Sequence, residues 1–308
     1  MSGLMKLFVA LSVVQNQIVK EVIAVAKASS YVPENCKGII DGLKSLGTKH
    51  SIWNVFEDWL KVCSISISNA VDWNQANERE EQYLETINKY TPEEQKVLTK
   101  TFAELVNALQ KEATFEGPCD LLGKVFHALE LHNKYHGQFF TPFHICEFMG
   151  QVALGDGGEA GNVASEALHE KGYLSVCEPC VGSGGMVLGF AKAMQQNHMN
   201  YCNQMVAYCC DIDIKCVHMA YLQLSLYGIP AVIIHGNSLT NEEWSRWYTP
   251  VYMINGWPMR ERVENLLETI QEATQDRPAV KSEEIPSEIA EDFTDETEIK
   301  EYEQIAIF

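Results

Sequence analysis

The sequence predicts an α/β fold in which an open, doubly wound sheet follows a region of α-helices. Up to about residue 130, apolar residues recur at the three- and four-residue spacing of helices. After Gly150, apolar runs of strand length alternate with helical stretches, which is typical of parallel β–α–β units. A long Glu/Asp-rich segment then follows. We therefore expect three regions: an α-helical domain at 1–135, an α/β domain at 136–273 and an acidic, disordered tail at 274–308.

The first residues favour an amphipathic helix over a membrane segment. Lys6 and the apolar run 7–11 have some features of a signal peptide, but apolar residues continue in helical rhythm through Val25, with Gln and Lys between them. No apolar run approaches the length that spans a bilayer. We expect a cytoplasmic protein without membrane contact.

Capping residues mark later helices of this region. Thr91 followed by Pro92 and two glutamates is a typical helix start, with Thr as the cap and Pro in the first turn. Another helix begins near Asp120, and apolar spacing predicts one within 52–71.

The α/β region is predicted to contain four strands with helices between the first three. The strands are the apolar runs 173–177, 205–210, 231–234 and 251–254, and the helices are 185–195 and 214–226. A glycine-rich break at 155–158 and a short polar helix precede the first strand, and a last helix is expected from about Arg262.

The net charge of −19 is unfavourable for a protein that grips DNA through many phosphate contacts. From residue 261 to the end there are 15 acidic and 4 basic side chains, a net charge of −11, so the preceding residues carry only −8. The acid is concentrated in the tail, which leaves room for a basic surface elsewhere.

The 10 cysteines do not form a disulfide framework, because most lie in apolar runs as reduced, buried thiols do. Cys177 and Cys180 have the spacing of a zinc half-site, and Cys202 and Cys216 are the residues that would have to complete it. No second half-site of matching form follows. We expect no metal.

The strongest local signal is the segment 178–185, which reads Glu-Pro-Cys-Val-Gly-Ser-Gly-Gly. It follows a predicted strand and opens a predicted helix. Glycines there let the backbone turn sharply and approach a ligand that faces the helix amino terminus. Tight strand-to-helix turns also need glycine, so the cluster by itself is weak evidence.

Polar residues close the next two predicted strands. Asp211 ends the second, where a carboxylate can accept hydrogen bonds from ribose hydroxyls. Asn237 follows the third strand. Because parallel strands end at one edge of a sheet, these groups predict a nucleoside-type pocket with Glu178.

Two motifs carry a resemblance to a known family. Residues 137–142 read Gly-Gln-Phe-Phe-Thr-Pro, and 178–185 follow them in the order and spacing of the adenine-N6 methyltransferases of type I restriction-modification systems, phage and prophage members above all. Glu178 replaces the usual Asp. The resemblance covers about residues 59–257 and implies a Rossmann-like, S-adenosylmethionine-dependent methyltransferase sheet, here shortened.

The resemblance implies which residues contact S-adenosylmethionine. Either Phe139 or Phe140 would lie against the cationic sulfonium, and the alternative is that both are core residues. Asp211 would accept from the ribose hydroxyls, with Asp213 as a weaker candidate. Thr141 and Pro142 would start a helix as cap and first-turn residue, and the carbonyl of Asn237 would accept from the adenine amine. The implied set is Phe139, Phe140, Thr141, Pro142, Glu178, Pro179, Gly182, Ser183, Gly184, Asp211 and Asn237.

The catalytic loop departs from the family. Members carry Asn/Asp-Pro-Pro-Tyr/Phe after the fourth strand, whereas this chain has Asn-Gly-Trp-Pro at 255–258. Asn255 would accept hydrogen bonds from the target amine, and Trp257 would stack on the flipped base. The alternative is that Trp257 covers the end of the core.

Selectivity and partners must come from elsewhere, because no target-recognition region is visible after Asn255. The first helices, a second copy of the chain or a specificity partner would supply it. Residues 304–308, Gln-Ile-Ala-Ile-Phe, resemble the bacterial sliding-clamp-binding peptide, with Gln304, Ile307 and Phe308 as anchors. The acidic tail would then act as a tether at the replication fork.

The expected function is methyl transfer from S-adenosylmethionine to adenine N6 in DNA, within the cytoplasm of a bacterial host and in association with its nucleoid. The alternative is a degenerate member that binds the cofactor and acts as a clamp-tethered interaction or anti-defence protein. A weaker option is methylation of RNA or of a protein side-chain amide.

Overall fold

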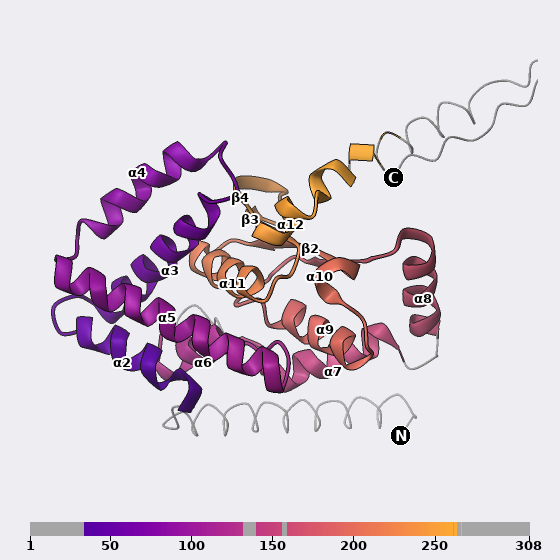
Figure 1. The fold of residues 1–308 in the computed structure, drawn as a ribbon, viewed down its shortest axis with the longest axis horizontal. Coiled ribbons are helices and arrows are strands. Elements are labelled where there is room, and N and C mark those ends of the chain that lie inside the picture. Colours follow the sequence, from indigo (N-terminus) through magenta and orange to yellow (C-terminus); the bar gives the residue numbers. More distant parts are fainter. Residues whose placement is uncertain (1–33, 132–139, 156–158, 261, 264–265, 267–308) are drawn as a thin grey trace, which may run out of the picture. The chain divides into compact units, whose positions relative to one another are not determined.

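The computed structural model of the chain describes residues 34–131, 140–155, 159–260, 262–263 and 266 (Figure 1). The helical region contains η1 (Glu34–Cys36), α2 (Lys37–Leu46), α3 (Ile52–Ser68), α4 (Ala76–Ile87), α5 (Pro92–Phe115) and α6 (Leu121–Ala128). The α/β region contains α7 (Phe143–Leu154), α8 (Glu159–Lys171), β1 (Leu174–Glu178), α9 (Gly185–Gln196), α10 (Tyr201–Gln204), β2 (Met205–Asp211), α11 (Ile214–Leu226), β3 (Ala231–Asn237), β4 (Glu242–Tyr248) and α12 (Pro250–Ile254). The order of elements confirms the predicted α/β fold.

The sheet has the strand order β1-β2-β3-β4, with β1, β2 and β3 parallel and β4 antiparallel to β3. Glu178 is paired with Cys209, and Asp211 is paired with His235. The carboxyl ends of the three parallel strands therefore meet at one edge, as the sequence predicts. This is a short Rossmann-like sheet.

The predicted strand 251–254 is wrong, because these residues lie in the helix α12. Thr249 precedes Pro250 at the start of α12, the same Thr-Pro pair that starts α5 at Thr91. The strand after β3 is instead β4, whose glutamates and arginine hide its alternation in a hydropathy pattern.

The two faces of the sheet are covered differently. Alternate residues such as Ala207 and Ile233 belong to the large core that the sheet shares with α9, α11 and the helical region. Their neighbours Val206 and Val232 pack on the other face in a smaller cluster with Tyr252. The described residues up to Arg260 thus belong to one compact unit, and the predicted domain boundary at residue 135 lies outside the described part.

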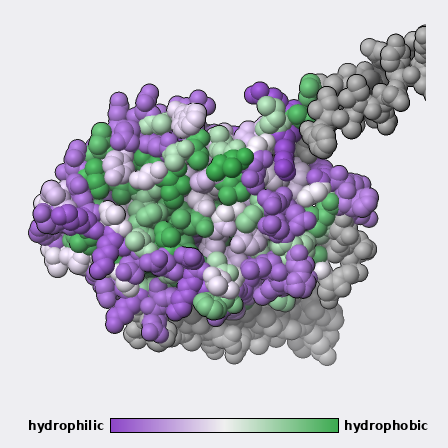
Figure 2. Space-filling view, viewed as in Figure 1, coloured by the Kyte–Doolittle hydropathy of each residue, from purple (hydrophilic) through white to green (hydrophobic). Residues whose placement is uncertain are grey.

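The surface in the view of Figure 2 is hydrophilic around most of its rim, with hydrophobic residues gathered toward the middle. Across the described ranges, no helix combines the length and the apolar character that a bilayer crossing requires.

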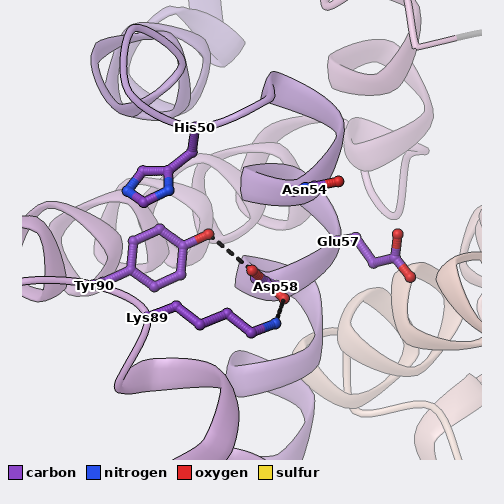
Figure 3. A pocket seen from close by; sticks show the side chains of 6 residues that line it. All are labelled: His50, Asn54, Glu57, Asp58, Lys89 and Tyr90. Atoms are coloured by element: carbon purple, nitrogen blue, oxygen red, sulfur yellow. Dashed lines mark hydrogen bonds and ion pairs between the residues drawn. The ribbon is translucent and has the colours of Figure 1, made fainter.

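The segment that leads from α4 to α5 is tied to α3 by polar contacts (Figure 3). The Tyr90 hydroxyl donates to Oδ2 of Asp58, and Nζ of Lys89 lies 3.0 Å from Oδ1 of the same carboxylate. Thr91 then caps α5 through a complete capping box with Glu94, which confirms the predicted helix start. These contacts fix α5 against α3.

Helices α7 and α9 pack against each other (Figure 1), and a pair of glycines lies at their contact. A Cβ added to Gly150 would lie 2.6 Å from the carbonyl oxygen of Gly189, and one added to Gly189 would lie 2.5 Å from the backbone carbonyl of Cys146. Only glycine at both positions allows this approach. This contact matters for the site, because α9 follows the 178–185 segment and α7 follows Phe140.

Replacing Gly189 with Ala is expected to lower the free energy of unfolding by roughly 1–3 kcal/mol, since the new methyl group forces the two backbones apart. Chemical denaturation measures this. Gln195→Ala, at an exposed position of the same helix, serves as the control and should stay within about 0.5 kcal/mol. A more stable Gly189→Ala variant, as helix propensity alone would give, contradicts the close packing.

Candidate functional site

The glycine-rich loop between β1 and α9 is fixed to the end of β2. Gly182 and Gly184 have φ values of +54° and +96°, in the left-handed region that glycine adopts without strain. The backbone N–H of Gly182 donates to Oδ2 of Asp211 over 2.8 Å, and the N–H of Val181 donates to the carbonyl of Cys210 over 2.9 Å. Loop and carboxylate therefore hold each other in place.

Two carboxylates stand at this edge of the sheet. Asp211 also accepts from the N–H of Asp213, and Glu178 accepts from the N–H of Cys180. Burial raises the pKa of both carboxyl groups, and the negative charge of Asp211 raises the pKa of Glu178 further. Both carboxylates are partly buried and can accept further hydrogen bonds. They therefore suit a ligand that donates hydrogen bonds from hydroxyl or amine groups.

Asn237, at the end of β3, already holds a turn. Its Oδ1 accepts from the N–H of Leu239 at 3.0 Å and from that of Thr240 at 3.4 Å. The sequence predicts that this same oxygen accepts a hydrogen bond from the adenine amine of the cofactor. That predicted bond would compete with the two bonds that hold the turn. Asp213 caps α11 through the N–H of Lys215, which gives it a structural task.

Phe140 lies against the glycine-rich loop, whereas Phe139 is outside the described residues. An added Cβ on Gly182 would lie 3.1 Å from Cδ1 of Phe140, and the Phe140 ring centroid is 4.9 Å from that of Phe126. This ring therefore joins the core to the loop. The expectation that the 137–142 segment approaches the 178–185 segment is confirmed for Phe140.

The predicted cap of the following helix is wrong. Helix α7 begins at Phe143, and Pro142, in an extended conformation, is its N-cap, so Thr141 lies one residue too early. Thr141 is exposed and lines a cavity of about 340 Å³. The cavity lining is Asp120, Gly123, Lys124, His127, Phe140, Thr141, Pro142, Phe143 and His144.

A buried carboxylate, Asp120, supports the site from behind and was missed as a site residue. It caps α6, and its Oδ1 accepts from the N–H of Gly123 and from Nε2 of Gln223. Its Oδ2 accepts from the Ser183 hydroxyl over 2.6 Å. The capping pattern in the sequence reveals the helix start, but Gln223 and Ser183 come from distant segments and leave no local signal.

Ser183 and Gln223 are also joined to each other, because Nε2 of Gln223 donates to the Ser183 carbonyl over 2.7 Å. Ser183 is only 2% exposed. Its hydroxyl thus serves the protein interior, and a ligand contact by Ser183 would have to use its backbone.

Asn255 and Trp257 are not at this edge, which corrects the predicted catalytic pair. Nδ2 of Asn255 donates to the Cys202 carbonyl and to Oδ1 of Asn203, both on α10, which leads directly into the amino end of β2. Trp257 is 1% exposed and packs on Tyr173, just before β1, with ring centroids 4.7 Å apart. Both residues lie at the opposite ends of the strands, and the reading of Trp257 as a cover for the core is the one the structure supports.

The zinc reading finds no support among the described residues, where no group of three or more His, Cys, Asp or Glu side chains is arranged to hold a metal ion. Cys177 and Cys180 are exposed, whereas Cys216 is buried.

Comparison with known proteins points to one family. A model of the N-6 DNA Methylase family matches residues 120–262, from Asp120 to just beyond α12. No curated protein matches the sequence.

Two solved structures are similar at low identity. A putative class I S-adenosylmethionine-dependent methyltransferase from Listeria monocytogenes is 13% identical with a TM-score of 0.37, covering 68% of this chain and 55% of that one. The type I restriction-modification system methyltransferase subunit from Streptococcus thermophilus is 18% identical with a TM-score of 0.35, covering 73% and 48%. The chain spans about half the length of these structures.

Asp120→Asn is expected to lower the free energy of unfolding by about 1–3 kcal/mol, because the amide cannot accept from all three of its buried donors. Thermal or denaturant unfolding measures the loss. Asp41→Asn, the same substitution at an exposed position of α2, is the matched control and should stay within about 0.5 kcal/mol. Equal stability of Asp120→Asn and the parent would contradict the network.

Proposed function

We propose that the chain, of which residues 120–262 match the model of the N-6 DNA Methylase family, binds S-adenosylmethionine at the edge formed by Glu178, Gly182 and Asp211 and transfers a methyl group to adenine N6 in DNA. The bond between the Gly182 N–H and Asp211 is the observation that carries the proposal, because it joins a glycine-rich turn to an acidic strand end. This is the arrangement that a nucleoside ligand requires.

The residues present suit the cofactor. The Asp211 carboxylate would accept hydrogen bonds from the ribose hydroxyls, and the left-handed glycines leave space for the backbone to approach the ligand. The amino terminus of α9 opens directly after Gly184, and the Phe140 ring supplies an aromatic face beside it for a cationic sulfonium. The proposed cofactor contacts of Phe139 and Pro179 depend on the sequence motifs alone.

S-adenosylmethionine, when bound, supplies an electrophilic methyl group, and the protein must orient the target amine toward it. Asn255 cannot do so from the amino ends of the strands. The acceptor for the target amine must therefore come from another part of the chain or from a partner such as a specificity subunit or a second copy.

The position of Asn255 and Trp257 favours a second candidate function. A chain that keeps the cofactor edge but has no catalytic loop beside it would bind S-adenosylmethionine without turnover and act as an interaction or anti-defence protein. The clamp-binding peptide, with Gln304, Ile307 and Phe308, fits either candidate and lies outside the described residues.

Asp211→Asn is expected to weaken S-adenosylmethionine binding at least tenfold, since hydrogen bonds to a charged acceptor contribute about 1.5–3 kcal/mol. Titration calorimetry measures the affinity. Asn255→Ala should bind like the parent because it lies at the other end of the strands. Tight binding by Asp211→Asn would contradict the assignment.

The affinity for S-adenosylmethionine measured in the same titration should depend on pH. The ionised form of Asp211 accepts from the ribose, and its pKa is raised, so affinity should fall on acidification at a higher pH than an ordinary Asp, near 3.9, would give. The Asp211→Asn variant should lack this component.

Transfer of a tritiated methyl group to unmethylated DNA tests the enzyme. We expect incorporation at adenine N6 that is lost in Asp211→Asn and retained in Asn255→Ala. Cofactor binding without incorporation into DNA would contradict the enzyme and support the second candidate, whereas incorporation into RNA or protein would reassign the substrate.

A further inference from the structure

A cavity of about 330 Å³ lies between the helical region and the β3–β4 end of the sheet. Its volume falls within the range of small-molecule sites. None of the residues assigned above to the cofactor lines it. The lining comprises Glu57 and Lys61 of α3, Gln75 before α4, Glu78, Arg79 and Gln82 of α4, Ile214 and His218 of α11, His235 of β3, and Trp244, Ser245 and Trp247 of β4.

One wall of this cavity is aromatic and accessible. The Trp244 side chain is 51% exposed although it lies on a strand of the sheet. Its ring centroid is 4.8 Å from that of His235, at an interplanar angle of 75°. An indole that is held by a neighbouring ring and left open to solvent offers a face on which a planar ligand can stack.

The floor is rigid. Trp247 is 4% exposed, and Cζ of Arg79 stands 4.0 Å from its ring centroid. Arg79 is itself held by Asp72 at 3.1 Å and by the Arg246 carbonyl at 2.7 Å. The guanidinium therefore serves to shape the cavity and is not a mobile charge.

His218 lies at this floor with one ring nitrogen that is buried and unpaired. The residue is 3% exposed, its ring centroid is 5.0 Å from that of Trp247, and its Nδ1 is buried without a hydrogen-bond partner. Burial lowers the pKa of His218 to about 3, so the ring is neutral at pH 7 and carries one donor and one acceptor nitrogen. A buried nitrogen without a partner is costly unless a ligand or water satisfies it.

The rim adds groups that match the edge of a base. Gln75 and Gln82 carry amides, Glu57 and Glu78 carry acceptors, and Lys61 carries a cation. Nε2 of Gln82 already donates to Oε1 of Glu78 over 3.4 Å, which leaves the amide of Gln75 and the Oε1 of Gln82 for a ligand. Figure 3 shows Glu57 turned away from Asp58 and Tyr90.

The neighbouring cavity in Figure 3 is different. There Lys89 and Tyr90 both pair with Asp58, and Nε2 of His50, which has no hydrogen-bond partner, lies 3.6 Å from Oε1 of Glu94. The lining of that cavity holds no exposed indole like that of Trp244, because its one large aromatic ring, Tyr90, is buried.

We infer that the cavity lined by Trp244 and His218 binds an unpaired nucleobase, either of a single strand or of a free nucleotide. The base stacks on the Trp244 indole, its polar edge meets His218 and the amides of the rim, and its phosphate lies toward Lys61. Stacking tolerates every base, whereas the amides and the imidazole favour those with both donors and acceptors on one edge. The inference goes beyond the cofactor edge and does not depend on methyl transfer.

Titration calorimetry with deoxyadenosine monophosphate, a short single-stranded oligodeoxynucleotide and its duplex tests this. Ribose 5-phosphate, which has no base, should not compete. Trp244→Ala should weaken binding roughly tenfold or more. His218→Phe replaces the imidazole with an aromatic ring that has no nitrogen, and should also weaken binding of the base. Trp73→Ala removes an indole that is 81% exposed and does not line the cavity, so it should bind like the parent.

Comparing the oligonucleotide with the mononucleotide shows which of the two is the natural source of the base. A strand that binds far more tightly than the mononucleotide identifies nucleic acid as the ligand, and equal affinities identify a free nucleotide. Full parental affinity in Trp244→Ala and His218→Phe, with unfolding temperatures that show both fold, overturns the inference. So does loss of binding under saturating S-adenosylmethionine, because the cavity would then be part of the cofactor site. Asp211→Asn, which tests the cofactor edge, should leave nucleobase binding unchanged.

Discussion

The carboxylate of Asp120 is the meeting point of three segments that are far apart in the sequence. It caps α6, accepts from Ser183 in the glycine-rich loop and accepts from Gln223 on α11. A buried carboxylate is stable only when its oxygens accept hydrogen bonds. The Gly123 N–H, the Ser183 hydroxyl and the Gln223 amide must therefore all be in place in the folded chain. The position of the loop relative to the helical region follows from this requirement. The match to the N-6 DNA methylase family also begins at Asp120.

The second constraint is the parallel arrangement of β1, β2 and β3, which puts all their carboxyl ends on one edge. Glu178 and Asp211 stand there with raised pKa values, at a cost in desolvation that a ligand with several hydrogen-bond donors would offset. The opposite edge holds Asn255 and the buried Trp257, whose contacts are those of a structural closure. The proposed cofactor edge and the Asn-Gly-Trp-Pro segment thus lie at opposite ends of the strands.

Much of this arrangement is predictable from the sequence, because it depends on local rules. Glycine in a strand-to-helix turn, an acid at a strand end and a capping residue before an apolar rhythm each leave a local pattern, and the predicted helix 214–226 coincides with α11. The polar residue that follows an apolar run likewise predicts a strand end at Asp211, where β2 ends.

Other features either carry two local patterns that favour different elements or depend on tertiary contacts that leave no local pattern. The apolar run 251–254 fits a strand or a helix equally well, and the preceding Thr249-Pro250 pair selects the helix. A strand rich in charged residues, β4, is stable because it pairs with β3 and buries Trp247. The Asp120–Ser183 bond and the approach of Gly150 to Gly189 are contacts between segments that only the fold brings together.

The most direct test of the proposed cofactor edge is a crystal structure of the chain with S-adenosylhomocysteine, the unreactive product of methyl transfer. We expect the ribose hydroxyls within hydrogen-bonding distance of the Asp211 carboxylate, and the thioether beside Gly182 and Phe140. A ligand bound at the Asn255 end of the strands, or Asp211 facing only solvent while the ligand sits elsewhere, would contradict it.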